Sequence, residues 1–230
     1  MTRFPRRFAT TVTAILAFGC VVMASARDEE EFKPLFNGKD LAGWDGEAAT
    51  WKVEDGVIVG TTTKEAPLPY NKFLIWRGGT VKDFHLKAKV KQKGNNSGIQ
   101  YRSAELKNVG PYSVGGYQCD IHPQANYNGM LYDERGRGIV AENGQKVVID
   151  PNGNRFVTSL GGPAPADPDG WNDYEIIARG AHLTHKLNGK VAMELDDFQE
   201  SERELEGILA FQIHAGPAMR VEIKDLSDER

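Results

Sequence analysis

The chain has 230 residues and a formal net charge of −4 at pH 7. An acidic chain of this size is a poor ligand for nucleic acids and for anionic membrane surfaces, because both repel negative charge. The composition therefore argues against nucleic acid and anionic membranes as partners.

The N-terminus has the pattern of an export signal. Three arginines precede an uncharged apolar run over residues 9–23, and the small residues 24–26 form a cleavage site before an acidic stretch. The apolar run is short for a membrane span. We predict a signal peptide over residues 1–26 and a periplasmic or secreted protein with no membrane attachment after cleavage. The alternatives are a retained anchor and lipid attachment at Cys20.

The mature chain is expected to be a single domain over residues 27–230. Cleavage removes three arginines and no acidic residue, so the net charge of −4 becomes −7. Cys119 is then the only cysteine, which excludes an internal disulfide, and stability must come from a hydrophobic core.

Short segments with a two-residue period follow one another along the mature chain, and none has a long 3.6-residue period. In chain order, the expected elements are an apolar lead-in at residues 32–44, a hairpin at 51–60, strands at 73–76 and 84–90, two central strands at 98–102 and 117–122, a strand at 174–178, a hairpin at 182–195, and strands at 207–214 and 219–224. Asp55-Gly56 and Asn188-Gly189 suit the hairpin turns. The pattern predicts an all-β fold, a two-sheet β-sandwich, without an internal domain boundary.

Three of these strands have an unusual polar face. Glutamine, arginine, aspartate and histidine stand where lysine, glutamate and threonine are common on a solvated strand. These residues are Gln100 and Arg102 in the first strand, Gln118, Asp120 and His122 in the second, and Gln212 and His214 in the third. If the three strands are neighbours in one sheet, their polar faces form one candidate site.

Common catalytic motifs are missing: there is no Gly-rich phosphate loop, HExxH, CxxC or GxSxG. The ExDxE pattern of β-sandwich glucanases is also missing, which disfavours a standard two-carboxylate glycosidase. Cys119 lies on the apolar phase of its strand and is expected in the core.

The polar residues themselves leave two kinds of chemistry open. Asp120 and His214 are either an acid/base pair or two ligands of a divalent metal ion, and Arg102 is a candidate for stabilising an oxyanion. The amides of the site suit sugar hydroxyls, because an amide both donates and accepts. The candidate substrate contacts are Gln100, Gln118, Gln212, Tyr132 as a stacking surface, and His185. The alternative for each residue is a structural polar group with its hydrogen bonds satisfied inside the protein.

Several longer segments together resemble the 3-keto-disaccharide hydrolase domain family. They are FKPLFNGKDLAGW (32–44), NSGIQYRS (96–103), GYQCDIH (116–122), GMLYDE (129–134), WNDYEIIARG (171–180), HKLNGK (185–190) and GILAFQIHAGPAMRVEIKDL (207–226). The resemblance covers essentially the whole mature chain. It implies a jelly roll of the concanavalin A-like lectin and glucanase type.

The resemblance also implies action on glycosides oxidised to a ketone at C3. The ketone acidifies the C2 proton, a base removes it, and the enolate expels the group at C1. Carried over from the family pattern, His214 is the base, Asp120 orients it or binds metal, and Arg102 stabilises the enolate. One divalent metal ion held by Asp120 and His214 is expected, and no organic cofactor. The alternative hypothesis is a non-catalytic carbohydrate-binding domain on the same polar face.

Overall fold

The computed structural model describes Met1 and residues 31–230, so the predicted signal peptide lies outside the described residues except for Met1. Within residues 31–230 the structure contains seventeen strands and no helix, which confirms the all-β prediction. The strands are β1 (Lys33–Pro34), β2 (Trp44–Asp45), β3 (Trp51–Glu54), β4 (Val57–Thr61), β5 (Lys72–Trp76), β6 (Phe84–Gly94), β7 (Ser97–Glu105), β8 (Val114–Ile121), β9 (Leu131–Glu134), β10 (Gly138–Ala141), β11 (Gln145–Ile149), β12 (Arg155–Ser159), β13 (Asn172–Arg179), β14 (His182–Leu187), β15 (Lys190–Asp197), β16 (Ile208–Ile213) and β17 (Met219–Glu229).

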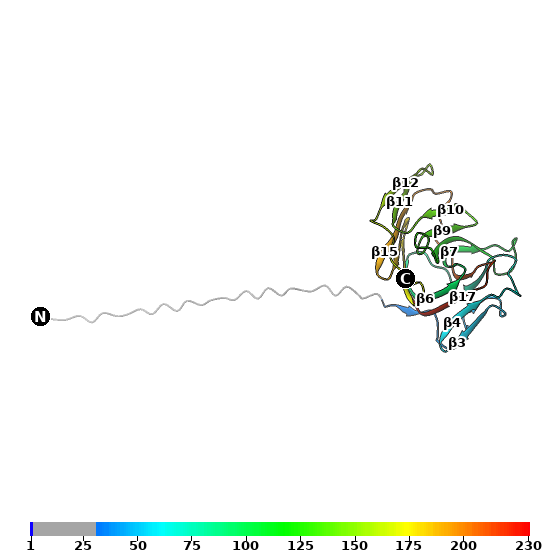
Figure 1. Cartoon of the computed structure of the whole chain (residues 1–230). Helices are drawn as coiled ribbons and strands as arrows, with labels where there is room; N and C mark the ends of the chain where they lie inside the picture. The colour runs from blue at the N-terminus through cyan, green and yellow to red at the C-terminus, as the bar shows by residue number, and fades with distance from the viewer. Residues whose placement is uncertain (2–30) are drawn as a thin grey trace.

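The strands form two sheets, as predicted (Figure 1). The larger sheet has ten strands in the order β12-β11-β15-β14-β13-β6-β17-β4-β3, with β1 added beside β17. The smaller sheet has seven strands in the order β10-β9-β8-β7-β16-β5-β2. Neighbouring strands are antiparallel except for β11 and β15, which are parallel. The arrangement is a jelly-roll sandwich.

Both predicted hairpins are present. Asp55 and Gly56 have φ angles of 47° and 78° between β3 and β4, and Asn188 and Gly189 have φ angles of 50° and 78° between β14 and β15. Two consecutive left-handed residues match the right-handed twist of the flanking strands, which is why Asp-Gly and Asn-Gly occupy these turns.

The core lies between the two sheets. Ile99 on β7, Cys119 on β8 and Ile213 on β16 face Leu86 and Ile176 of the larger sheet's strands, and all are fully or almost fully buried. Each such aliphatic side chain contributes roughly 1.5–3 kcal/mol by leaving water. The predicted core position of Cys119 is confirmed. Since Ile99, Cys119 and Ile213 point inward, the alternate residues of the same strands point to the outer face of the smaller sheet.

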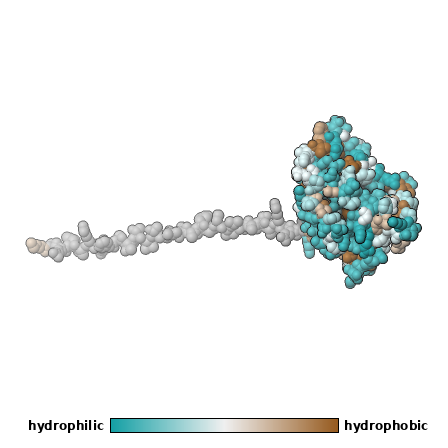
Figure 2. Space-filling view, in the orientation of Figure 1, coloured by the Kyte–Doolittle hydropathy of each residue, from teal (hydrophilic) through white to brown (hydrophobic). Residues whose placement is uncertain are grey.

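The face seen in Figure 2 is mainly hydrophilic, with hydrophobic groups in small separate areas. One of these areas lies over β12 at the top of the view, where Phe156 and Val157 are exposed. Among the described residues, no helix is long and apolar enough to cross a membrane.

Candidate functional site

The three strands with polar faces are neighbours, which confirms the condition on which the predicted site depends. Strand β7 lies between β8 and β16, with Gln100 opposite Gln118 on one side and opposite Ala210 on the other. The outer face of these strands, together with β9 and the adjoining loops, encloses a pocket of about 630 Å³. It is lined by Asn71, Asn96, Gln118, Asp120, His122, Tyr127, Met130, Tyr132, Asp133, Glu134, Arg135, Gly136, Ile139, Gln212 and His214. This volume is typical of a small-molecule site.

Asp120 is held by a chain of amides. Gln100 Nε2 donates to Gln118 Oε1 at 3.1 Å, and Gln118 Nε2 donates to Asp120 Oδ1 at 2.6 Å. The Gln118 side chain lies flat across Gly98, where a Cβ atom would come within 2.2 Å of Gln118 Cδ. A glycine at this position of β7 therefore gives Gln118 the room to reach Asp120. The predicted sugar contact Gln118 lines the pocket, but both ends of its amide bind protein groups and orient Asp120.

The carboxyl group of Asp120 is unusually easy to protonate. Burial, with a smaller contribution from the negative charge of Glu134, raises its pKa from 3.8 to about 7 against the lowering effect of the Gln118 hydrogen bond. Asp120 Oδ2 accepts no hydrogen bond within residues 31–230, so this oxygen is the one available to carry a proton into the pocket. A carboxyl group that exchanges its proton near neutral pH suits acid/base chemistry.

His214 follows β16 directly and is held at Nδ1. This nitrogen contacts the carbonyl oxygen of Ala215 and lies 3.0 Å from Asn95 Nδ2. An amide nitrogen can only donate and a carbonyl oxygen can only accept, so the contacts of His214 Nδ1 with Asn95 Nδ2 and with Ala215 O belong to opposite tautomers, and the tautomer that donates from Nδ1 to Ala215 O leaves a lone pair on Nε2. The Asn95 amide then donates to the Ala215 oxygen at 3.3 Å. Nε2 has no hydrogen-bond partner in the described part of the chain, and it is free to act as a base.

Asp120 does not orient His214, contrary to the predicted pairing. Asp120 binds Gln118, and it is the pKa of Glu134, not that of Asp120, that the charge of His214 lowers. Asn71 links Glu134 to the backbone beside His214. Its Nδ2 donates to Glu134 Oε1 at 3.3 Å, and its Oδ1 accepts from the backbone amide of Ala215 at 3.0 Å. Asp120 and Gln118 are two residues apart on the same face of β8, so the Asp120 carboxylate bonds along its own strand and does not reach His214.

Sequence reasoning missed Glu134, Asn71 and Asn96. Glu134 is the last residue of β9, and burial raises its pKa above the usual 4.5. Its strand was not recognised as a neighbour of β8, although Tyr132 lies directly opposite Gln118. Asn71 and Asn96 lie outside the strands, where no periodicity marks a side chain as facing the site.

Two amide oxygens in the pocket lack partners. Gln212 Oε1 and Asn96 Oδ1 are both inaccessible to solvent and accept no hydrogen bond from any described residue. A buried acceptor without a donor costs roughly 1–3 kcal/mol, and since neither oxygen is accessible, a ligand would supply the donor only after the side chain turns toward the pocket. Gln212 lines the pocket, in agreement with its predicted position.

Two aromatic residues form part of the pocket wall. Tyr132 is half-buried and lines the pocket, in agreement with its predicted position, and burial raises the pKa of its hydroxyl. Tyr127 packs edge-on against His122 with ring centroids 5.2 Å apart.

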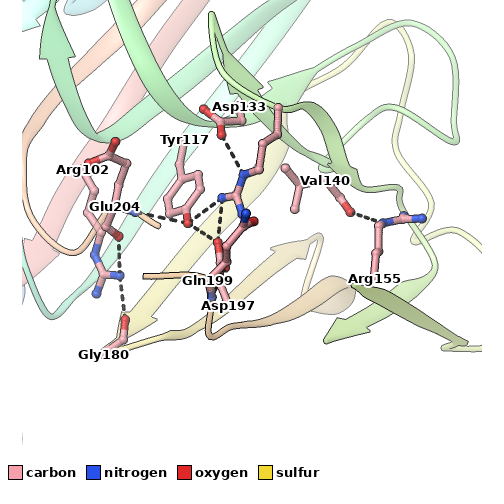
Figure 3. A network of polar contacts seen from close by, with 10 residues as sticks. Arg102, Tyr117, Asp133, Val140, Arg155, Gly180, Asp197, Gln199 and Glu204 are labelled. Atoms are coloured by element: carbon pink, nitrogen blue, oxygen red, sulfur yellow. Dashed lines mark hydrogen bonds and ion pairs between the residues drawn. The ribbon is translucent and has the colours of Figure 1, made fainter. Parts of the chain in front are cut away.

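The prediction that Arg102 faces the site is wrong. A bulge between Tyr101 and Ala104 breaks the alternation of β7, and Arg102 itself has a φ angle of 47°. The bulge turns the side chain toward loops at the end of the sandwich, where it donates to the carbonyl oxygen of Gly180 at 2.7 Å (Figure 3). It also donates to the carbonyl oxygen of Lys82 at 2.8 Å and to that of Glu204, and it contacts Asp83. Arg102 is buried, holds these loops together by hydrogen bonds, and does not line the pocket.

The predicted substrate contact His185 lies in the core. It is fully buried, its Nε2 contacts the Tyr101 hydroxyl at 2.8 Å, and its Nδ1 lies 3.0 Å from the Gly129 oxygen. Burial lowers its pKa from 6.5 to about 4, so it is neutral in the folded protein. The prediction for His185 is wrong because β14 belongs to the larger sheet, whose inner face packs against the core. Gln100 is likewise fully buried and acts only through Gln118.

A second polar network supports the pocket wall from behind. Arg137 donates to Asp133 Oδ2 at 3.1 Å and to Asp197 Oδ2 at 2.6 Å, and the Tyr117 hydroxyl donates to the same Asp197 oxygen (Figure 3). Asp133 is next to Glu134 in β9, so the network fixes the strand end that carries Glu134 to β15 of the larger sheet.

The donor set of the pocket does not fit the expected metal ion. Among the described residues, no group of three or more His, Cys, Asp or Glu side chains is arranged to hold one. Asp120 Oδ2 and His214 Nε2 keep free lone pairs, but no third His, Cys, Asp or Glu side chain joins them within the described residues. No step proposed below uses a metal ion.

A jelly-roll sandwich with a polar, amide-rich pocket on one sheet defines the class: the fold is that of galectin-like and glucanase jelly rolls. The family model described as a 3-keto-alpha-glucoside-1,2-lyase-like domain matches residues 31–227. The chain belongs to this family, as the sequence resemblance predicted.

Solved structures share the fold at low sequence identity. A candidate glycosyl hydrolase from Parabacteroides distasonis aligns with a TM-score of 0.60 and 17% identity over 86% of this chain and 98% of that chain. A second candidate glycosyl hydrolase from the same organism has a TM-score of 0.58 and 21% identity over 87% of this chain and 94% of its own. The carbohydrate-binding module CBM66 from Bacillus subtilis has a TM-score of 0.54 and 13% identity over 82% of this chain and 96% of that chain. No curated protein sequence matches the chain.

Proposed function

We propose that the protein is an exported enzyme that cleaves glycosides carrying a ketone at C3 of the sugar. The observation that carries this proposal is the pairing, in one pocket, of a base and an acid. His214 presents a free Nε2 lone pair, and Asp120 is a buried carboxyl group with a pKa of about 7. The family's description as a lyase acting on 3-keto-glucosides supports the same chemistry.

The reaction begins with removal of the C2 proton. His214 Nε2 takes this proton, and the C–H electron pair becomes the C2–C3 double bond of an enolate with its charge on the C3 oxygen. Protonated Asp120 donates a hydrogen bond from Oδ2 to that oxygen. Such stabilisation of a developing oxyanion replaces the role first expected of Arg102.

Elimination completes the cleavage. The ketone re-forms, the electron pair moves to a C1–C2 double bond, and the bond from C1 to the leaving oxygen breaks. The leaving oxygen takes the proton that His214 received, so the enzyme returns to its starting state. Addition of water across the C1–C2 double bond then gives the free 3-keto sugar.

A non-catalytic carbohydrate-binding domain is the second candidate. The unpartnered oxygens of Gln212 and Asn96 support it, since sugar hydroxyls would supply the missing donors. The similarity in fold to a carbohydrate-binding module is compatible with this reading.

One experiment separates the two. The protein is incubated with a 3-keto-glucoside and with its unoxidised parent, each with and without a chelator, and release of the C1 group is followed. Release from the keto compound alone supports elimination. Sugar binding without release from either compound supports the binding domain, and release from both contradicts the elimination mechanism. Loss of release with the chelator would show that a metal ion takes part.

A further inference from the structure

Strand β12 forms an open end of the larger sheet. It pairs with β11 alone, and all five of its residues are exposed. Phe156 and Val157 are 59% and 47% exposed, the highest values for large hydrophobic side chains within residues 31–230. The strand lies at the top of the molecule in Figure 1, where Figure 2 shows a hydrophobic area. The proposed function gives this strand no role.

The register with β11 decides which backbone groups of β12 are free. The amide of Leu160, one position beyond the strand, donates to the Gly144 oxygen at 2.7 Å. In an antiparallel pair the hydrogen-bonded positions alternate, so the residues two and four positions before Leu160 also bind β11. The other three residues direct their N–H and C=O groups away from β11, and no other strand of the described chain pairs with them. They are Arg155, Val157 and Ser159.

The other ends of the two sheets are protected in the ways that proteins use against unwanted strand pairing. Strand β3 carries the ion-paired Lys52 and Glu54, β10 has a bulge between Ile139 and Ala141, and β2 has only two residues. In contrast, β12 has no lysine, acidic residue or proline, and its register with β11 is unbroken. An exposed, regular and apolar edge of this kind is a site for adding a further strand.

We propose that β12 binds β12 of a second copy of this chain, antiparallel and about a two-fold axis at Val157. Each outward-facing residue then meets an outward-facing residue. Val157 pairs with Val157 of the second copy, and on either side of the axis Arg155 pairs with Ser159 of the other copy. Each such pair exchanges two bonds, so this register makes about six hydrogen bonds. A shift by one residue would place the outward-facing groups opposite groups already bound to β11.

The charge of this part of the chain favours a second copy as the partner. Residues 151–166 contain a single charged residue, Arg155, and no acidic one, although the whole chain has a net charge of −4. Two acidic molecules therefore approach at this edge with less repulsion than elsewhere. The two-fold pairing places Arg155 opposite Ser159 and Phe156 opposite Thr158, so no like charges face each other.

The size of the contact sets its strength. Each copy contributes a strand of five residues, whereas a standard interface uses roughly 20–30 residues a side. The dimer is therefore weak and forms reversibly as the protein concentration rises. It is also closed, because the part of the chain that the structure describes has one such edge and a two-fold contact occupies it in both copies.

Sedimentation velocity over about 1 μM to about 1 mM protein tests the proposal, because this range brackets the affinities of weak specific complexes. The sedimentation coefficient is expected to rise with concentration toward that of a dimer. Val157→Pro is the critical variant. Since the Val157 N–H faces away from β11, proline costs no bond within the sheet but removes two bonds of the contact. We expect it to weaken association by about 10-fold or more.

Val53→Pro is the matched control at the other end of the same sheet. The Asp55-Gly56 turn joins a hydrogen-bonded pair of β3 and β4, so the Val53 N–H also faces away from its neighbouring strand. This variant is expected to associate like the parent. A parent that stays monomeric throughout, or equal association of the two proline variants, would overturn the proposal.

A pair of cysteine variants examines the register without depending on whether proline is tolerated. Val157→Cys places two thiols at the axis, where the Cα atoms of a hydrogen-bonded pair lie about 5.5 Å apart, within reach of a disulfide. Thr158→Cys is the control, because the pairing places Thr158 opposite Phe156 and its two copies in different rows. The native Cys119 is buried.

With oxidised glutathione, Val157→Cys is expected to form a covalent dimer on a non-reducing gel, and Thr158→Cys is expected to remain monomeric. Equal cross-linking of both variants, or of neither, rejects this register and the dimer with it. Neither measurement requires the proposed activity, so the dimer and the proposed function stand or fall separately.

Discussion

At the scale of single residues, the chemistry depends on which nitrogen of His214 carries the proton. The tautomer in which Nδ1 donates to the Ala215 carbonyl oxygen is the one that leaves Nε2 as the base. Replacement by glutamine keeps a side chain that donates to the Ala215 oxygen but removes the base. We expect His214→Gln to lower kcat on a 3-keto-glucoside by about 100-fold or more, with sugar affinity changed little.

The matched control for this prediction is His182→Gln, a histidine on the outer face of the larger sheet that pairs with Asp196. It should leave kcat unchanged. If His214→Gln retained most of the turnover, the base would have to be another residue of the pocket.

Asp120 gives the reaction a pH dependence of known sign. The mechanism needs its protonated form, and its pKa is about 7, so kcat should fall as the pH rises above about 7. Asp120→Asn keeps an N–H donor that does not ionise. We expect this variant to have a lower kcat at pH 6 and no alkaline decline between pH 7 and 9. A pH profile that declines identically in both proteins would assign the titration to another group.

Gln212 tests the binding half of the site. Because its Oε1 has no partner, Gln212→Met removes an unpaired buried acceptor from the free protein and a contact from the complex. The expected result is about 3- to 10-fold weaker sugar binding, corresponding to one neutral hydrogen bond, with an unchanged or higher Tm. Calorimetry and thermal unfolding measure the two effects. Unchanged affinity would show that Gln212 does not contact the sugar.

At the scale of elements, alternation predicted most of the site and failed at a bulge. Gln118, Asp120, Gln212 and His214 face the pocket because the alternation holds through these residues of β8 and through β16 from Ala210 onward. Arg102 does not, because a bulge adds a residue to β7 and reverses the phase beyond it. The bulge is set by contacts distant in sequence, which a period-two pattern cannot reveal.

The bulge also explains why Arg102 is buried. Gly207 packs on it so closely that a Cβ would lie 2.4 Å from the Arg102 carbonyl carbon. The arginine then satisfies carbonyl oxygens from three loops. We expect Arg102→Leu to lower the free energy of unfolding by about 3 kcal/mol or more, since several buried acceptors lose their donor. Urea unfolding measures this loss. The kcat per folded molecule should not change, whereas a specific loss of kcat would restore a catalytic role.

At the scale of the whole molecule, two buried groups make opposite contributions to stability. The folded protein keeps the Asp120 proton between about pH 4 and 7, where the unfolded chain has lost it, so the free energy of unfolding falls as the pH rises through that range. His185 behaves in the opposite way. Its pKa of about 4 means that only the unfolded chain is protonated between about pH 4 and 6.5, so stability rises with pH there. The two slopes largely cancel.

Asp120→Asn should reveal this cancellation, because asparagine resembles the protonated acid at every pH. A change of about three pKa units corresponds to about 4 kcal/mol as an upper bound. We therefore expect the variant to be more stable than the parent at pH 7.5 by up to that amount, and nearly equal to it at pH 4. Once the Asp120 contribution to the pH dependence is removed, the variant alone should lose stability steadily as the pH falls below about 6.5, because His185 is then protonated only in the unfolded chain.

Urea unfolding at pH 4, 5.5 and 7.5 measures the difference, and the exposed Asp169→Asn serves as the control for removing a surface carboxylate. A difference between variant and parent that stays constant with pH would mean that Asp120 is ionised in the folded protein, and the acid of the proposed mechanism would then have to be Glu134.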